Sequence, residues 1–281
     1  MAGSPGGMEG IPSFSGSGSH SGAFQPSYPT GPSMATTPEA RPHRGEARER
    51  QVRTLFSEIA PRYDLLNHVL SLNIDRRWRR RAVDLLDVPP GDPEVRVLDA
   101  CAGTYDLSLE LTGRKGFSGR VVASDFARPM LVEGQGKLRG NPIAPVCGDT
   151  LRLPFPDGAF HRAMVAFGVR NLSDPARGFA EFARVLSPGG RLVILEFTTP
   201  PNRLTRGLYL FYFHRILPLI GRIVSGHPWA YTYLPESVKE FPGPDELARM
   251  LEANGFQRAE WSYLTAGIAA IHVAIKEESP E

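Results

Sequence analysis

Between residues 95 and 197 the chain alternates short apolar runs with segments of helical spacing. The runs are almost continuously apolar and rich in β-branched residues, as buried parallel strands are. They cover residues 95–100, 119–125, 144–149, 161–169 and 190–197. This alternation predicts a doubly wound α/β sheet, in which a ligand lies at the carboxyl ends of the strands, near the point where the strand order reverses.

One helix of this alternation has clear signals at both ends. Asp174 and Pro175 suit a helix cap and a first helical position, and apolar residues then recur at helical spacing. We expect this helix to stop at Pro188-Gly189-Gly190. Further segments lie outside the alternation. Residues 46–86 read as helical, 202–238 are rich in aromatic and aliphatic residues, and a helix over 243–256 precedes two strand-like runs at 258–265 and 269–276.

Composition divides the chain of 281 residues into two parts. Residues 1–45 are dominated by Gly, Ser and Pro, and such a segment buries too little apolar surface to offset its ordering entropy. We therefore expect a disordered extension over 1–45 and one folded domain over 46–281. Within the domain, 46–90 form a helical cap and 200–240 an insertion on the substrate side. His214, Arg215 and Arg222 interrupt the apolar stretch near 208–224, which predicts no membrane-spanning helix.

The charge and the cysteines exclude some classes of protein. A net charge of +2 favours neither nucleic acid nor strongly acidic partners. The two cysteines, Cys101 and Cys147, cannot form a disulfide framework, and no spacing suggests a metal site. The extension lacks the features of a secretory signal. We expect a cytoplasmic protein, peripheral on the inner face of a membrane if it touches one, with organellar import the less favoured alternative.

The stretch VLDACAGTYDL, residues 97–107, has the outline of a strand, a ligand-binding turn and a helix. Asp99 ends the first strand, Gly103 permits close approach of a ligand, and Asp125 ends the second strand, where a carboxylate can accept from a ribose diol. With Asp99 and Asp106 beside it, the turn would repel a pyrophosphate. It suits a cationic nucleoside without phosphate, such as S-adenosylmethionine. The alternative is a structural turn whose aspartates cap a helix.

Two further pairs follow later strands. Asp149 and Thr150 come after the third strand, where they could bond to an adenine edge, although this stretch taken alone favours an ordinary loop. Arg170 and Asn171 end the fourth strand. Because an unpaired buried charge is costly, Arg170 either faces a substrate or is tied to a neighbouring carboxylate.

Ordered motifs over residues 56–276 resemble the ubiquinone/menaquinone biosynthesis C-methyltransferases, the UbiE/MenG family. Residues 56–78 are similar to the first signature of that family and 184–198 to its second. LPFPDGAF, FGVRN, YTYLPESV, FPGPDEL and YLTAGIAAIH fall where the family has equivalents. The resemblance implies a class I S-adenosylmethionine-dependent methyltransferase fold: a Rossmann-like seven-stranded sheet, helices on both faces and an antiparallel last strand. It also implies C-methylation of a demethylated isoprenoid quinol, demethylmenaquinol in the first place and a ubiquinone precursor in the second.

The resemblance also implies site residues. Cofactor contacts are expected at Asp99, Gly103, Thr104, Asp125, Asp149 and Thr150. Arg170 and Asn171 match the catalytic pair, and since an arginine is a poor base we favour Arg170 as an electrostatic stabiliser of the phenolate. Substrate contacts are expected at Tyr63, Asn67, Tyr231 and Tyr233.

The chain departs from the family pattern at Tyr105, where a glycine is usual, and at Asp75, where the first signature has histidine. The phenol of Tyr105 is expected either to narrow the cofactor pocket or to supply a new hydrogen bond. The arginines of 76–81 could contact anionic lipid headgroups or form a solvated helix face. The sequence leaves open whether the protein forms a homo-oligomer. The alternatives are a methyltransferase for another lipophilic or aromatic small molecule, and a non-catalytic partner protein with the same fold.

Overall fold

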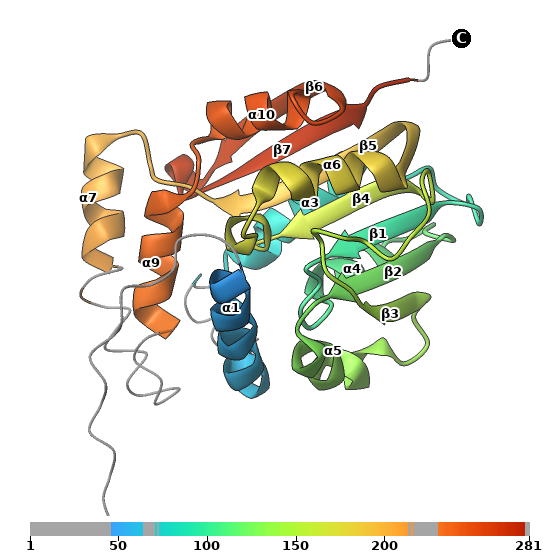
Figure 1. Ribbon diagram of the computed structural model, residues 1–281, viewed down its shortest axis with the longest axis horizontal. Coiled ribbons are helices and arrows are strands. Elements are labelled where there is room, and N and C mark those ends of the chain that lie inside the picture. Colours follow the sequence, from blue (N-terminus) through green and yellow to red (C-terminus); the bar gives the residue numbers. More distant parts are fainter. Residues whose placement is uncertain (1–45, 64–70, 72, 213–214, 216–229, 279–281) are drawn as a thin grey trace, which may run out of the picture. The chain divides into compact units, whose positions relative to one another are not determined.

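The structure is a computed structural model that describes residues 46–63, 71, 73–212, 215 and 230–278. The expected disordered extension over 1–45 lies outside the described residues, as does Asn67. The folded part is an α/β sandwich with a seven-stranded sheet at its centre (Figure 1).

The sheet has the order β3-β2-β1-β4-β5-β7-β6. The first five strands are parallel, and β7 is antiparallel to both of its neighbours. Their bounds are Arg96–Ala100 (β1), Arg120–Asp125 (β2), Ile143–Cys147 (β3), Phe160–Ala166 (β4), Leu186–Phe197 (β5), Phe256–Leu264 (β6) and Ala269–Lys276 (β7). The strand order reverses at β1, which pairs with both β2 and β4. The loop after β1 therefore occupies the position where doubly wound sheets bind ligands.

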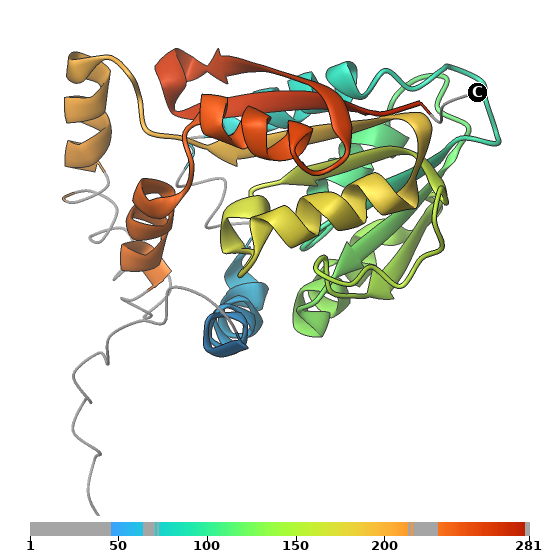
Figure 2. The same ribbon diagram turned by 45° about the horizontal axis from the view of Figure 1, so that its top comes forward.

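Helices cover both faces of the sheet (Figures 1 and 2). On one face lie α3 (Asp75–Leu86), α4 (Asp106–Thr112) and α5 (Arg128–Gly134); on the other lie α6 (Pro175–Val185) and α10 (Pro244–Glu252). Successive residues of β1 point to opposite faces, so Val97 joins the first core and Leu98 the second, both fully buried. This two-faced burial explains the continuous apolar runs.

Further helices stand near the carboxyl ends of the strands. They are α1 (Glu46–Ile59), the 3₁₀ turns η1 (Ala60–Arg62) and η3 (Val169–Asn171), α7 (Arg203–Phe211) and α9 (Ala230–Glu240). In Figures 1 and 2, α1 stands beside the strand ends, and α7 projects outward from the sheet. Thus α1 from the predicted cap and α7 and α9 from the predicted insertion lie near the ligand-binding edge, whereas α3, also within the predicted cap, covers a face of the sheet.

The predicted end of the 174–190 helix is wrong. The helix begins as expected, with the Asp174 side chain accepting from the Arg177 amide, but α6 ends at Val185 and β5 begins at Leu186. Leu186 has an extended ψ of 142°, and Pro188 disfavours helical geometry at the residue before it. The residues between Leu186 and Arg191 form an irregularity in the pairing with β4, with Gly189 at φ +68°.

Candidate functional site

The loop after β1 has a left-handed backbone at three of its five residues. The φ angles are +52° at Cys101, +56° at Gly103 and +72° at Tyr105. Left-handed geometry costs a non-glycine residue about 1–2 kcal/mol, so the surrounding contacts must hold this loop. The Ala102 amide donates to Ser124 O, and the Gly103 amide donates to Asp125 Oδ2 at 2.9 Å. The loop is thereby fixed to the end of β2.

The side chain of Tyr105 lies in the protein core, so both expectations for it, a narrower pocket and a new hydrogen bond to the ligand, are wrong. It is fully buried, and its hydroxyl donates to Leu131 O in α5 at 2.7 Å. Its ring packs so closely on Gly134 that a Cβ there would lie 2.6 Å from it. The ring fills the space beside Gly134 of α5. The sequence around Tyr105 does not indicate that this space exists.

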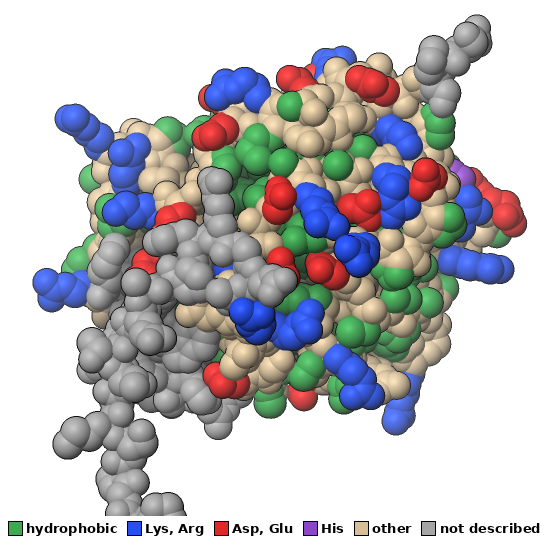
Figure 3. Space-filling view, in the orientation of Figure 1, with side chains coloured by type: hydrophobic (Ala, Val, Ile, Leu, Met, Phe, Trp, Pro, Cys, Tyr) green, Lys and Arg blue, Asp and Glu red, His purple; other side chains and the backbone are tan. Residues whose placement is uncertain are grey.

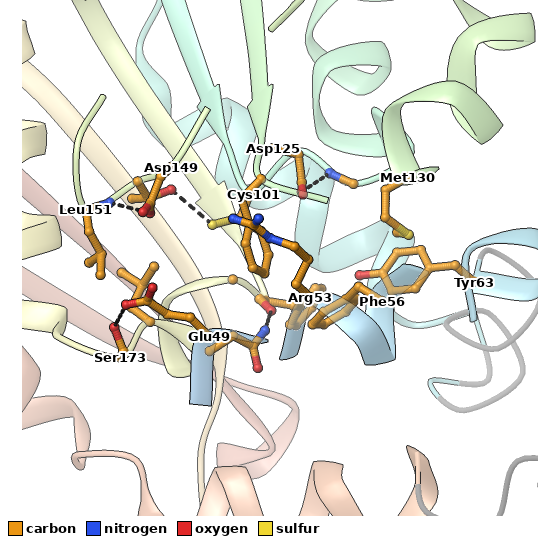
Figure 4. Close-up of a pocket in the computed structure, with 17 residues that line it drawn as sticks. Glu49, Arg53, Phe56, Tyr63, Cys101, Asp125, Met130, Asp149, Leu151 and Ser173 are labelled. Atoms are coloured by element: carbon orange, nitrogen blue, oxygen red, sulfur yellow. Dashed lines mark hydrogen bonds between the residues drawn. The ribbon is translucent and has the colours of Figure 1, made fainter. Parts of the chain in front are cut away.

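The main pocket opens at the carboxyl ends of β1, β2, β3 and β4. It brings together six of the predicted residues: Tyr63, Gly103, Asp125, Asp149, Thr150 and Asn171. Figure 4 shows Asp125 and Asp149 converging on this cavity with Arg53 and Phe56 of α1. The wall formed by α1 was not predicted. Its only signal in the sequence is the amphipathic pattern before the first signature.

Asp125 at the end of β2 has the strongest geometry for a ribose contact. Oδ1 accepts from the Ala127 amide at 2.8 Å and Oδ2 from the Gly103 amide at 2.9 Å. Only 6% of its surface is exposed, and this burial raises its pKa to about 6 although the two amides favour the charged form. Each carboxylate oxygen has a second lone pair, so the two fixed oxygens can also accept from a ligand hydroxyl.

Asp149 and Thr150 line the same pocket from the loop after β3. Asp149 Oδ1 accepts from the Leu151 amide at 2.9 Å, which forms a local turn. Thr150 Oγ1 lies 3.4 Å from Cys101 Sγ. Burial raises the pKa of the Cys101 thiol to about 12, so the thiol stays protonated and is not a nucleophile at neutral pH.

A smaller recess adjoins the main pocket and shares Tyr63 and Cys101 with it; we call it the loop recess. It contains the predicted residues Asp99 and Thr104, which are 1% and 2% exposed. Asp99 Oδ2 accepts from Ser108 Oγ at 2.5 Å. Burial raises the pKa of Asp99 to about 7 against the effect of this hydrogen bond. The acid is therefore poised between its neutral and charged forms near neutral pH.

Arg79 also lines the loop recess, which the sequence reasoning missed. It is only 6% exposed, whereas Arg76, Arg77, Arg80 and Arg81 are exposed. Neither expectation for the cluster 76–81, lipid contact or a solvated face, therefore holds for Arg79. A usable signal was its place one helical turn after Asp75, with which it forms a buried ion pair.

Arg170 is tied to a carboxylate, one of the two alternatives left open. Its Nη1 donates to Glu196 Oε1 at 2.7 Å and to Phe167 O at 2.6 Å, and its backbone amide donates to Glu196 Oε2. Burial opposes the charge, but Glu196 together with Tyr233 and Tyr63 outweighs this effect and raises the pKa of Arg170 above its ordinary value. Arg170 lines a neighbouring groove, while Asn171 lines the main pocket.

Asn171 is oriented from two sides. Its Nδ2 donates to Phe167 O at 3.2 Å, and its Oδ1 accepts from the Tyr233 hydroxyl at 2.9 Å. Tyr233 of α9 is buried, and this burial raises its pKa. It therefore supports the pocket through Asn171. The side chain of Tyr231, like Asn67, lies outside the described residues.

The two connected cavities suit S-adenosylmethionine. The loop amide that would cradle a phosphate, at Gly103, is already bound to Asp125, and buried carboxyl groups at Asp99 and Asp125 would repel a pyrophosphate. A sulfonium nucleoside has no phosphate and carries positive charge. Asp125 can hold its ribose, Asp149 and Thr150 its base, and the loop recess its amino-acid end.

Fold and site together define a class I methyltransferase, and solved structures support the fold. An S-adenosylmethionine-dependent methyltransferase from Thermotoga maritima is similar with a TM-score of 0.56 and 17% identity, covering 80% of this chain and 99% of that one. A second, from Aquifex aeolicus, has a TM-score of 0.51 and 18% identity, covering 70% and 89%.

The sequence profile of the ubiE/COQ5 methyltransferase family matches residues 44–276, and the chain belongs to that family. It is 50% identical to a demethylmenaquinone methyltransferase of Thermus thermophilus over 78% of this chain and 98% of the relative. A demethylmenaquinone methyltransferase of Deinococcus radiodurans is 46% identical over 85% and 99%. The resemblance stated from the motifs is confirmed, as are the methyltransferase activity and the cofactor S-adenosylmethionine.

Proposed function

We propose that this protein transfers the methyl group of S-adenosylmethionine to a ring carbon of a demethylated isoprenoid quinol, demethylmenaquinol in the first place and a ubiquinone precursor in the second. The supporting observation is the mixed lining of the main pocket. It combines the carboxyl groups of Asp125 and Asp149 with the aromatic rings of Phe56, Tyr63 and Phe167. A flat, neutral ring can pack against such rings. The names of the relatives point to the same substrate class.

For this reaction the protein has to align the two substrates and raise the electron density of the ring. The cofactor supplies an activated methyl group, and the protein must hold the ring carbon in line with it. Asn171 is fixed by Phe167 O and Tyr233, so its amide can orient a ring hydroxyl. Phe167 has a left-handed φ of +60°, which is part of what sets this geometry.

Arg170 does not act as the base, because its pKa is raised and its charge is paired with Glu196. The pair is neutral as a unit, so it acts on a developing phenolate as a fixed dipole rather than as a free cation. The Arg170 carbonyl also accepts from Arg48 Nη2 of α1 at 3.1 Å. Arg170 thus links the strand end to α1 and supports Asn171 beside it.

A second part of the proposal is contact with an anionic membrane surface through α7. No helix in the described ranges is long and apolar enough to cross a bilayer. On α7, however, Leu204, Leu208 and Phe211 are 73%, 64% and 60% exposed, and the helix has two arginines and no acid. Figure 3 shows basic and hydrophobic side chains side by side over α7. An apolar face flanked by arginines suits a bilayer that dissolves the quinol.

The membrane part is tested by sedimentation with vesicles of pure phosphatidylcholine and of phosphatidylcholine with phosphatidylglycerol. We expect binding to the anionic vesicles only, with loss on Leu204→Glu plus Leu208→Glu. The control is Val132→Glu, because Val132 is 53% exposed on α5, away from α7. Binding that survives the double substitution would exclude α7 as the contact.

The substrate part is tested by expressing the protein in a bacterium that lacks its quinone C-methyltransferase and measuring the quinones by mass spectrometry. We expect methylated menaquinone with the wild-type chain and only demethylated quinone with Asp125→Ala. If the wild-type protein is soluble and binds the cofactor but the quinone stays demethylated, the alternative of another lipophilic or aromatic substrate replaces this proposal.

A further inference from the structure

The loop recess contains a cation held in a fixed position. Among the described residues that line it, Arg79 is the single positively charged side chain. It comes from α3, whereas Asp99, Thr104 and Asp106 come from the β1–α4 segment. Burying an arginine that is only 6% exposed is costly, so its charge must be balanced by a counter-charge. Its position beside a recess indicates that it can also bind a ligand.

Arg79 is held on one edge and loosely bound on the other. Its Nη1 pairs with Asp75, which also accepts from Ser71 Oγ at 2.6 Å. Its Nη2 lies 3.4 Å from Asp106 Oδ2, an oxygen that is shielded from solvent and has no hydrogen bond within the described part of the chain. The guanidinium also lies 5.7 Å from the ring centre of Phe167. The Nη2 edge is therefore the one on which a further acceptor can bind.

The charges around the recess match an amino-acid zwitterion. Asp106 Oδ1 is bound by Lys137 Nζ at 3.0 Å, so Arg79 and Lys137 together balance Asp75 and Asp106. Asp99 accepts a hydrogen bond from Ser108 and also lies within electrostatic reach of Arg79. A guanidinium that can bind a carboxylate thus lines the same recess as an acid that can accept from an ammonium group.

The shared lining of the two cavities indicates which part of the cofactor lies nearest Arg79. The nucleoside contacts at Asp125 and Asp149 lie in the main pocket, and the loop recess adjoins it through Tyr63 and Cys101. We propose that Arg79 binds the α-carboxylate of the methionyl group of S-adenosylmethionine, and that Asp75 is the positioning residue that holds Arg79 for this contact. Arg79 thereby sets the preference for the intact cofactor over one that lacks the carboxylate. The inference concerns the cofactor side and is independent of the quinol substrate.

The test is calorimetric binding without any quinol, with three probes: S-adenosylmethionine, decarboxylated S-adenosylmethionine and 5′-methylthioadenosine. The wild-type protein should bind S-adenosylmethionine roughly 10- to 100-fold more tightly than the decarboxylated probe, the range of one charge-assisted hydrogen-bonded contact. Arg79→Gln should reduce that ratio to about threefold or less and leave the affinity for methylthioadenosine within about threefold. Arg79→Lys should keep part of the preference, because it retains the charge without the planar fork.

The controls separate recognition from folding. Arg80→Gln changes the adjacent exposed arginine of α3 and should leave all three affinities unchanged. Since Arg79→Gln removes the ion pair of Arg79 with buried Asp75, Asp75→Asn plus Arg79→Gln removes both charges together and should show the same loss of preference. An equal loss of affinity for all three probes in the double variant would overturn the proposal in favour of a structural role. A wild-type preference below about threefold would overturn it without any variant, since a charged contact is worth more than that.

Discussion

Buried charged groups are arranged differently around the cofactor and around the substrate. On the cofactor side, Asp99 and Asp125 are buried acids held by neutral hydrogen-bond donors, and their carboxyl groups line the cavities. On the substrate side, the buried charge of Arg170 is cancelled by Glu196, and the neutral side chain of Asn171 lines the pocket. The cofactor side suits a cation and the substrate side a neutral ring. The position of acids without a positively charged hydrogen-bond donor thus determines where the cationic cofactor binds and where the neutral quinol binds.

The largest expected effect comes from breaking the cancelled pair. Glu196→Gln leaves Arg170 buried with no counter-charge, so the free energy of unfolding should fall by about 3–5 kcal/mol. Denaturant unfolding at pH 7 measures this. The matched control is Glu260→Gln, which removes the exposed ion pair of Glu260 with Arg258 and should change the unfolding free energy by less than about 1 kcal/mol. Equal effects of the two substitutions would show that the burial of the first pair is not decisive.

Next in size is the loss of the ribose acceptor. Asp125→Ala removes the carboxylate that the Gly103 and Ala127 amides bind, so affinity for S-adenosylmethionine should fall roughly 100-fold. Calorimetry gives this value. Asn171→Ala, on the substrate side, should leave that affinity within about threefold while lowering kcat. If both substitutions weakened cofactor binding alike, the division of the cleft into two sides would be wrong.

The pH dependence of cofactor binding tests the unpaired charge directly. The pKa of Asp99 is raised to about 7 and that of Asp125 to about 6, so both acids gain protons as the pH falls from 8 to 6. A cationic ligand prefers the ionised acids, and its affinity should drop roughly tenfold over that interval. Calorimetry across this range should show a much flatter profile for Asp99→Asn. An equally steep profile in the variant would exclude Asp99 as the source.

The same raised pKa has the opposite sign for the stability of the free protein. Burial disfavours the charged form of Asp99, so the stability of the free protein falls as the pH rises from about 4 to about 7. Ionisation of Asp99 therefore favours cofactor binding but disfavours folding. Denaturant unfolding at a series of pH values should show a weaker dependence of stability on pH between about 4 and 7 in Asp99→Asn.

Tyr105 should have the smallest effect on the site. Tyr105→Phe removes the hydrogen bond to Leu131 O and should cost about 1–3 kcal/mol of unfolding free energy, with cofactor affinity unchanged within about twofold. Thermal unfolding and calorimetry on the same samples separate the two quantities. A clear loss of cofactor affinity with unchanged unfolding free energy would show that the Tyr105 hydroxyl contributes to the binding site.

The central strands could be predicted because burial on both faces leaves a continuous apolar signal, and all seven strands lie close to their expected positions. The placement of Asp125, Asp149 and Asn171 followed from one rule, that parallel strands bring their carboxyl ends to one edge. The exception was the start of β5, since Leu186 fits a helical pattern and a strand equally well.

Side-chain direction was the part that sequence could not supply. Tyr105 and Gly103 lie two residues apart in one loop, yet one enters the core beside Gly134 and the other faces the cavity. Arg79 pairs with Asp75 one helical turn before it, and the fold also brings Asp106, 27 positions further along the chain, next to Arg79. Glu196 was not considered as the partner of Arg170, since their pairing depends on the register between β4 and β5.

The most direct test of the central claim uses purified protein, demethylmenaquinol in detergent and S-adenosylmethionine labelled with a trideuteromethyl group. Mass spectrometry of the quinone product reports whether the label reaches the ring. We expect one trideuteromethyl group on the ring, formed by the wild-type protein and lost in both Asp125→Ala and Asn171→Ala. Wild-type protein that binds the cofactor with normal affinity but leaves demethylmenaquinol unlabelled would contradict it.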